Sequence, residues 1–151
     1  MTLADLSQLR IAVGSFDTWP QLRCALGGLQ LRGLAADSAN CLALQRIFAT
    51  SQENLSVDKL AFPNNRETVC CTSGPLANLL AGRLMLGAPS LKDALGHWLV
   101  PRHAAYFEKT VESGKILLWV RVRNEGEERH ACKSLLATSS NSVGVHDFHN
   151  R

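Results

Sequence analysis

The sequence predicts an α+β fold built from two similar halves with a helical segment inserted between them. Each half contains a strand-like apolar segment, a polar turn and an amphipathic helical segment, in that order. The spacing repeats, because Leu29 follows Val13 by 16 residues and Leu136 follows Val120 by 16 residues. Two such halves in one sheet predict a ferredoxin-like, split β-α-β arrangement of about four antiparallel strands with two helices on one face.

The composition is that of an ordinary globular domain. The chain has 151 residues, of which 46% are hydrophobic and 19% are charged. A chain of this length can bury a substantial core without disulfide or metal crosslinks. We therefore expect residues 1–151 to form a single α+β domain, with residues 51–100 as a helical insert within it.

The N-terminal third is predicted to form a strand, a helix and a second strand. Large apolar residues alternate with smaller or polar ones over Leu9–Phe16, which is typical of a strand. Either Asp17 or Thr18 can cap the helix that follows, and Gly33 is suited to end it. The second strand is expected over residues 41–48.

The C-terminal third repeats this pattern. Ile116–Val122 is the most continuous apolar run with β-branched and aromatic residues, which predicts a central strand covered on much of both faces. Asn124–Gly126 has the composition of a turn, and Glu127–Thr138 carries the apolar spacing of a helix. Apolar residues within 143–148 predict a short final strand.

The middle of the chain is predicted to be mostly helical. Residues 51–65 are polar and interrupted by proline, which indicates a loop, and residues 69–71 can form a short strand. Leucine spacing predicts a helix over residues 75–86, with Ser73 as its N-cap and Gly87 at its end.

Two further helices complete this region. The Ser90–Asp93 segment resembles a capping box with Asp in place of Glu, and it predicts a short helix through Trp98. Pro101 begins another helix, which Gly114 ends. Together these helices would form a small layer that joins the two halves.

The charge distribution argues against a dedicated nucleic-acid-binding protein. The net charge is +3, and the basic residues are spread along the chain instead of forming a stripe interleaved with aromatic residues. Arg121 and Arg123 alternate along the apolar run near the C-terminus, and we interpret them as a solvated strand edge.

We predict a cytoplasmic protein without a membrane span. Residues 1–10 lack the basic and apolar regions of a secretory signal. Arg83 interrupts the longest apolar stretch, which is shorter than the roughly 20 residues that a spanning helix needs. The five cysteines are an odd number without a Cys-x-x-Cys pair, which argues against a disulfide framework.

Cys70 and Cys71 are the most reactive candidates in the sequence. They precede a predicted helix N-terminus, where the helix dipole and free N–H groups can stabilise a thiolate. Two alternatives remain open: the pair can be buried small residues, or Ser73–Gly74 can hold a phosphate at the helix start. We take Cys71 as a candidate ligand-binding residue.

Arg102, His103 and Tyr106 form a second candidate ligand-binding group. They occupy one predicted helical turn near Trp98, and helical spacing places Arg102 and Tyr106 on one face. They can line a cleft against the sheet. The alternative is a solvated helix face with Tyr106 packed at its edge.

His146 and His149 are the candidate metal ligands, because His146–His149 is the one short segment with several potential ligands. On a strand the two histidines point to opposite faces, so they converge only if the segment bends. The alternative is an ordinary C-terminal tail. No cofactor is predicted.

Several segments resemble the heat-induced stress protein family, a group of small bacterial general-stress-type proteins. The resemblance lies in residues 10–17 (RIAVGSFD), 100–108 (VPRHAAYFE), 114–122 (GKILLWVRV) and 143–148 (VGVHDF). It implies a proline-started helix carrying a tyrosine, then a strand, a helix and a closing strand. The family supplies no established catalytic residues, so the resemblance implies a fold and a stress-associated role only.

We expect a non-enzymatic, stress-associated or regulatory binding module that self-associates as a homodimer. The leucine-rich segment 76–86, with Leu91, Leu95 and Trp98, offers more apolar surface than one small sheet needs, which leaves a surface for a second copy or another protein. The alternative is a small-ligand-sensing domain or small enzyme that uses the cleft between the insert and the sheet. No catalytic residue is predicted.

Overall fold

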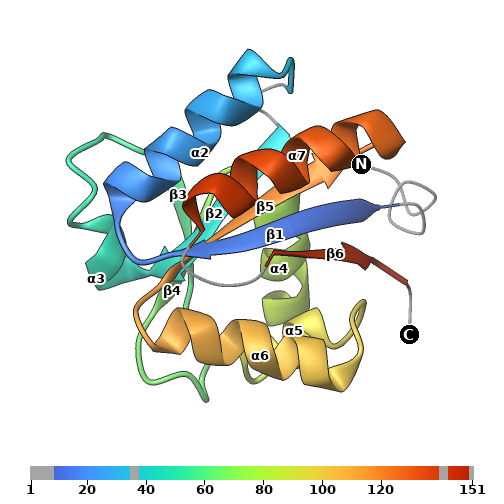
Figure 1. The fold of residues 1–151 in the computed structure, drawn as a ribbon. Coiled ribbons are helices and arrows are strands. Elements are labelled where there is room, and N and C mark those ends of the chain that lie inside the picture. Colours follow the sequence, from blue (N-terminus) through green and yellow to red (C-terminus); the bar gives the residue numbers. More distant parts are fainter. Residues whose placement is uncertain (1–8, 35–37, 140–142, 150–151) are drawn as a thin grey trace.

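A computed structural model describes residues 9–34, 38–139 and 143–149 of the chain. Its centre is one open antiparallel sheet of six strands in the order β3-β4-β2-β5-β1-β6 (Figure 1). The α+β class and the antiparallel sheet agree with the sequence prediction, but the predicted number of strands is two too few. Residues 1–8, which include most of the segment considered above for a secretory signal, lie outside the described residues.

The N-terminal third forms β1 (Arg10–Phe16), α2 (Trp19–Leu31), β2 (Ala39–Leu44) and the single turn α3 (Gln45–Phe48). Of the two predicted caps, Thr18 accepts a hydrogen bond from the Gln21 N–H at the start of α2. Gly33 follows α2 with φ +85°, a conformation that favours glycine. The second strand ends at Leu44, earlier than predicted, and the last residues of the predicted strand form α3.

The middle segment contributes two strands as well as two helices. These elements are β3 (Val57–Leu60), β4 (Val69–Thr72), α4 (Pro75–Met85) and α5 (Leu91–Leu95). The prediction of a loop over residues 51–65 is thus wrong for β3. This strand lies at the edge of the sheet, pairs only with β4 among the described strands, and carries the polar Asp58 and Lys59, so its apolar signal is weak.

The start of α4 also differs from the prediction. Its N-cap residue is Gly74, with φ +152°, and no side chain caps the helix. Ser73 instead contacts Ser56 and Asp58 through its hydroxyl. The predicted cap at Ser90 is confirmed, because its hydroxyl accepts a hydrogen bond from the Asp93 N–H at 3.1 Å.

The C-terminal third forms α6 (Pro101–Glu112), β5 (Ile116–Val122), α7 (Glu125–Thr138) and β6 (Gly144–Asp147). The predicted turn at Asn124 is the start of α7, where the Asn124 side chain accepts a hydrogen bond from the Glu127 N–H at 2.8 Å. β5 lies between β1 and β2, which confirms its prediction as a central strand.

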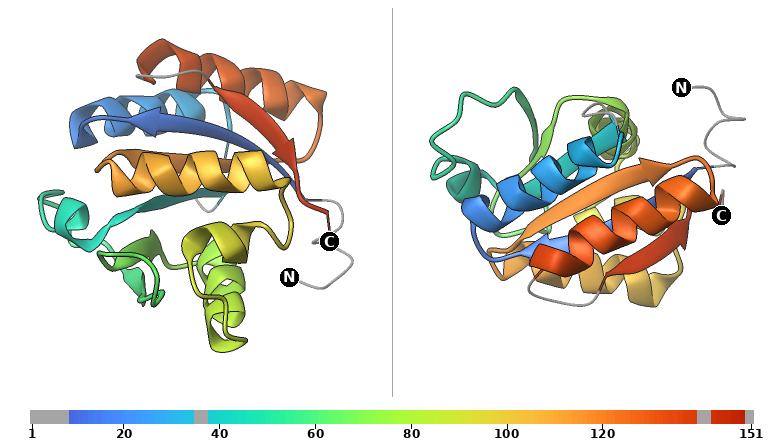
Figure 2. Two further views of the ribbon diagram at one scale, coloured as in Figure 1. Left: turned by 90° about the horizontal axis from the view of Figure 1, so that it is seen from below. Right: turned by 45° about the horizontal axis from the view of Figure 1, so that its top comes forward.

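Helices cover both faces of the sheet. Figure 2 shows α2 and α7 side by side over one face, while α4, α5 and α6 lie over the other. The side chains of β5 alternate between the two cores: Leu117 and Trp119 face α4–α6, and Leu118 and Val120 face α2 and α7. The region predicted as an insert thus supplies part of the second helical layer.

Candidate functional site

A small cavity between helix α4 and the sheet is the candidate functional site. Its volume is 160 Å³. Leu9 and Ile11 line it from the sheet side, and Pro75, Leu76 and Leu79 line it from the first turns of α4. These five side chains make most of its wall apolar.

Two arginines and two small polar residues complete the lining. Arg121 continues the row of β5 side chains that begins with Leu117 and Trp119, and Arg123 follows just beyond the strand. Ser38 and Asn40 lie across from them, before and within β2. None of the described lining residues is acidic, so the described lining combines two positive charges with mostly apolar side chains.

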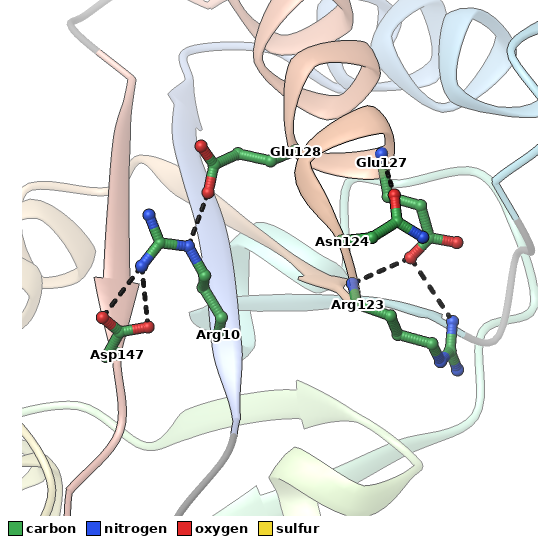
Figure 3. Close-up of polar contacts among 6 residues, drawn as sticks. All are labelled: Arg10, Arg123, Asn124, Glu127, Glu128 and Asp147. Carbon is green, nitrogen blue, oxygen red and sulfur yellow. Dashed lines mark hydrogen bonds and ion pairs between the residues drawn. The ribbon is translucent and has the colours of Figure 1, made fainter.

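The two arginines differ in their own partners. Arg121 is half-buried and makes no ion pair or hydrogen bond through its side chain with any described residue. Arg123 lies 3.4 Å from the Ser38 hydroxyl. It also lies 3.9 Å from the Glu127 carboxylate (Figure 3). Arg121 is therefore the side chain at the cavity whose charge is least compensated.

A neighbouring arginine shows the opposite situation. Arg10 donates hydrogen bonds to Glu128 on α7 and to both carboxylate oxygens of Asp147 on β6, at 2.9 and 2.8 Å (Figure 3). The hydrogen bonds that Arg10 donates to these two carboxylates raise its pKa above its usual value. This cluster borders an open hollow of 470 Å³ that is also lined by Arg121 and Arg123, so the hollow continues from the mouth of the cavity.

The start of α4 is held against β2 by a close backbone approach. Asn40 donates a hydrogen bond to the Thr72 carbonyl oxygen at 3.2 Å. A Cβ atom at Gly74 would lie 3.0 Å from the Asn40 side-chain nitrogen, closer than such contacts ordinarily are. Glycine at this position therefore lets α4 begin beside the cavity, with the positive end of its dipole at the lining residues Pro75 and Leu76.

Trp119 is a buried residue of the cavity lining. Its side chain is 2% exposed, and its indole Nε1 has no hydrogen-bond partner among the described residues. Arg83 and Trp98 also have a buried side-chain nitrogen without such a partner, but neither residue lines the cavity.

Cys71 does not belong to this cavity. It lies on β4 with its side chain in the core beneath α4–α6, while Cys70 faces the opposite core. Both residues are fully buried, and desolvation raises the pKa of each thiol above its usual value. The structure thus favours the interpretation as buried small residues over a reactive thiolate.

Arg102, His103 and Tyr106, which were predicted to form one ligand-binding group, do not all line the same cleft. His103 and Tyr106 line a separate cleft of 210 Å³ between α6 and the sheet, together with His146. Arg102 does not line this cleft and lies 3.4 Å from the His103 imidazole, Nε to Nε2. The ring centres of His103 and His146 are 4.7 Å apart, and burial, followed by the nearby His103, lowers the pKa of His146.

The two predicted metal ligands have different environments. His146 faces α6, whereas His149 lies beyond β6 and donates a backbone hydrogen bond to the Trp98 carbonyl at 3.1 Å. Within the described residues, no three His, Cys, Asp or Glu side chains are grouped to hold a metal ion. Metal binding by these histidines stays a prediction.

Comparisons with known proteins give no match to a family model, a curated protein or a solved structure. The resemblance to the heat-induced stress protein family therefore stays a prediction. In the part of the chain that is described, no helix has the length and apolar character needed to cross a membrane.

Sequence reasoning missed the residues of the cavity. Arg121 and Arg123 were interpreted as a solvated strand edge, because alternation alone does not reveal that a helix covers that face. The available signal was that the arginines extend an otherwise buried row of β5 side chains. Ser38 and Asn40 carry no comparable sequence signal.

Proposed function

We propose that the protein is a small-ligand-binding domain whose site is the cavity between helix α4 and the sheet. The observation that carries this proposal is an apolar cavity bordered by Arg121 and Arg123 without a described acidic lining residue. Such a combination of apolar walls with a few polar groups is typical of ligand sites. This is the alternative formulated from the sequence, with different residues in the site.

Binding and sensing fit the lining groups better than catalysis. Guanidinium, amide and hydroxyl groups can orient a ligand through hydrogen bonds. Ser38 is the one described lining residue of a type that attacks substrates, and no described lining residue is a His, Cys, Asp, Glu or Lys that could activate it or transfer a proton. We therefore assign no catalytic residue.

We also infer that four of the six strands form a ferredoxin-like unit. β1–α2–β2 and β5–α7–β6 are its two β-α-β halves, and in the order β2-β5-β1-β6 the strands of the two halves interleave. The β3–β4 hairpin extends this unit beside β2, and α4–α6 cover its second face. In this arrangement the cavity lies between the unit and the added helices.

A stress-associated or regulatory role and a homodimer stay predictions. The apolar residues on which self-association was based are mostly used within the chain, because Leu80, Leu91, Leu95 and Trp98 are buried. Met85 and Leu86, at the end of α4, remain exposed. Sedimentation at high micromolar concentration distinguishes a dimer from a monomer.

A thermal-shift screen with a filled-cavity control tests the proposed function. The panel contains neutral aromatic compounds, organic acids, amines and nucleotides, and the control is Leu79→Trp, which places a larger side chain at the half-buried cavity wall. A compound at about 100 times its Kd adds about 2.7 kcal/mol, roughly 5–10 °C for a chain of this size.

We expect at least one compound to stabilise the wild type and not Leu79→Trp. Tyr106→Ala, in the separate cleft beneath α6, is expected to respond as the wild type does. A panel without any stabilising compound, or stabilisation that Leu79→Trp leaves unchanged, contradicts the proposed site.

A further inference from the structure

We infer that the ligand is a small organic carboxylate, with its carboxylate at Arg121 and Arg123 and a single ring or short branched chain in the apolar cavity. This inference rests on the proposed function and adds the chemical class of the ligand. It is carried by the charge and the volume of the cavity formed by the described lining residues.

The charge of the site selects an anion. Arg121 and Arg123 border the cavity; the Glu127 carboxylate lies 3.9 Å from Arg123, whereas Arg121 has no ion-pair partner among the described residues. Arg121 is half-buried and has no described side-chain partner, so its desolvation is not offset within the described part of the chain. A carboxylate matches the planar guanidinium through two parallel hydrogen bonds, whereas an amine would be repelled.

The volume of the cavity selects a small apolar group. At 160 Å³ it is close to the roughly 150 Å³ of a dry, leucine-lined cavity that accommodates benzene. Leu9, Ile11, Leu76 and Leu79 provide such a lining. A single aromatic ring or a branched chain of similar size therefore fits, and a nucleotide base with its sugar does not.

The arrangement of the polar groups orients the ligand. Arg121 and Arg123 line both the cavity and the open hollow beside it, and the hollow is also lined by Glu125, Glu128 and Asp147, of which Glu128 and Asp147 pair with Arg10. The charged end of the ligand therefore lies at Arg121, at the boundary between the cavity and the hollow. The first turn of α4 adds the positive end of its dipole. Arg121 and the start of α4 both favour a ligand with acceptor atoms and a negative charge.

Phosphate monoesters share the negative charge, and the test separates them from carboxylates. We would measure calorimetric titrations of the full chain with four probes that share one ring: benzoate, benzamide, phenyl phosphate and benzylamine. The variants are Arg121→Met, which keeps much of the side-chain length, and Arg102→Met as a matched control on α6, outside the cavity.

We expect wild type and Arg102→Met to bind benzoate about tenfold or more tightly than benzamide, as charge-assisted hydrogen bonds imply. Arg121→Met is expected to remove that preference, with an unchanged circular dichroism spectrum as evidence of folding. Phenyl phosphate is expected to bind more weakly than benzoate, and benzylamine not to bind.

The opposite results separate two failures. Equal affinity for benzoate and benzamide, tighter binding of phenyl phosphate, or a preference that Arg121→Met retains would overturn the carboxylate assignment while leaving a ligand cavity in place. If no ring compound binds, the carboxylate assignment fails, and the thermal-shift screen with Leu79→Trp decides separately whether the cavity binds any ligand.

Discussion

Two arginines at one end of the sheet have opposite environments. Arg10 on β1 and Arg121 on β5 lie on neighbouring strands, one register position apart, since Arg121 pairs with Ile11. Arg10 faces α7 and is neutralised by Glu128 and Asp147, whereas Arg121 faces α4 and has no described counter-charge. A basic residue therefore indicates a binding site here only when its surroundings leave its charge uncompensated.

The composition of the two helices explains this difference. The first turn of α7 contains Glu125, Glu127 and Glu128, while the first turn of α4 contains no acidic residue. Acidic residues stabilise a helix N-terminus, so α7 is stabilised by its own sequence. We expect α4 to depend more on packing against the sheet and to leave its positive end available for a ligand.

The largest expected effect comes from removing the packing that seats α4. Leu80 is fully buried in the core beneath this helix, and Leu80→Ala should lower the free energy of unfolding by about 2–5 kcal/mol. Leu136→Ala on α7, where the side chain is 62% exposed, should change it by less than about 0.5 kcal/mol. Urea unfolding measures both, and similar losses would contradict this packing role.

The second prediction concerns a variant in which α4 carries an acidic residue at the cavity. Leu79→Glu places a carboxylate at the cavity wall, where it can neutralise Arg121 and compete with an anionic ligand. Leu79→Gln is the uncharged control of similar shape. We expect benzoate to bind about tenfold more weakly to the Glu variant than to the Gln variant. Equal affinities would show that charge compensation does not govern the site.

A third, smaller effect separates the structural arginine from the proposed binding arginine. Arg10→Met loses partly exposed ion pairs to α7 and β6, and it should lower stability by about 0.5–1 kcal/mol. Arg121→Met should leave stability unchanged or slightly increased, because no described ion pair is lost. Chemical unfolding at low and high salt tests this, and a salt-sensitive loss for Arg121→Met would contradict the comparison.

The smallest expected effect concerns pH and β6, the strand that carries Asp147. Burial, followed by His103, lowers the folded-state pKa of His146 below its usual value of 6.5. The unfolded chain therefore binds a proton more readily, and stability falls as the pH decreases from 6.5 through the lowered pKa. His146→Gln should reduce this fall by a fraction of a kcal/mol. An unchanged pH dependence of unfolding would contradict a contribution from His146.

Local patterns predicted most of the secondary structure. The repeated strand and helix at each end, the caps at Thr18 and Ser90, and the central position of β5 follow from residue spacing and side-chain chemistry. β3 was missed because an edge strand with polar residues lacks the apolar signal of a buried one. The cover on the second face of the sheet depends on tertiary packing that spacing does not encode.

The site was harder to predict than the fold. The sequence indicated a cleft between the middle segment and the sheet, and a cavity lies there, but its residues come from separate segments before β1, around β2, in α4 and along β5. The cavity lining does not include the four residues predicted from the sequence, Cys71, Arg102, His103 and Tyr106. That prediction rested on residues that are close in sequence, whereas the cavity is formed by segments that are far apart in sequence. Which face α4 covers decides whether Arg121 is solvated or borders a cavity.

The indole N–H signals of the three tryptophans provide the most direct test of the central claim, that Arg121 and the α4 cavity form one anion-binding site. Trp119 lines the cavity, whereas Trp19 and Trp98 do not. Proton–nitrogen correlation spectra recorded during a benzoate titration, with Trp119→Phe for assignment, should show a saturable shift of the Trp119 signal alone. Arg121→Met should abolish it. An unmoved Trp119 signal, or one that moves equally in Arg121→Met, would contradict the account.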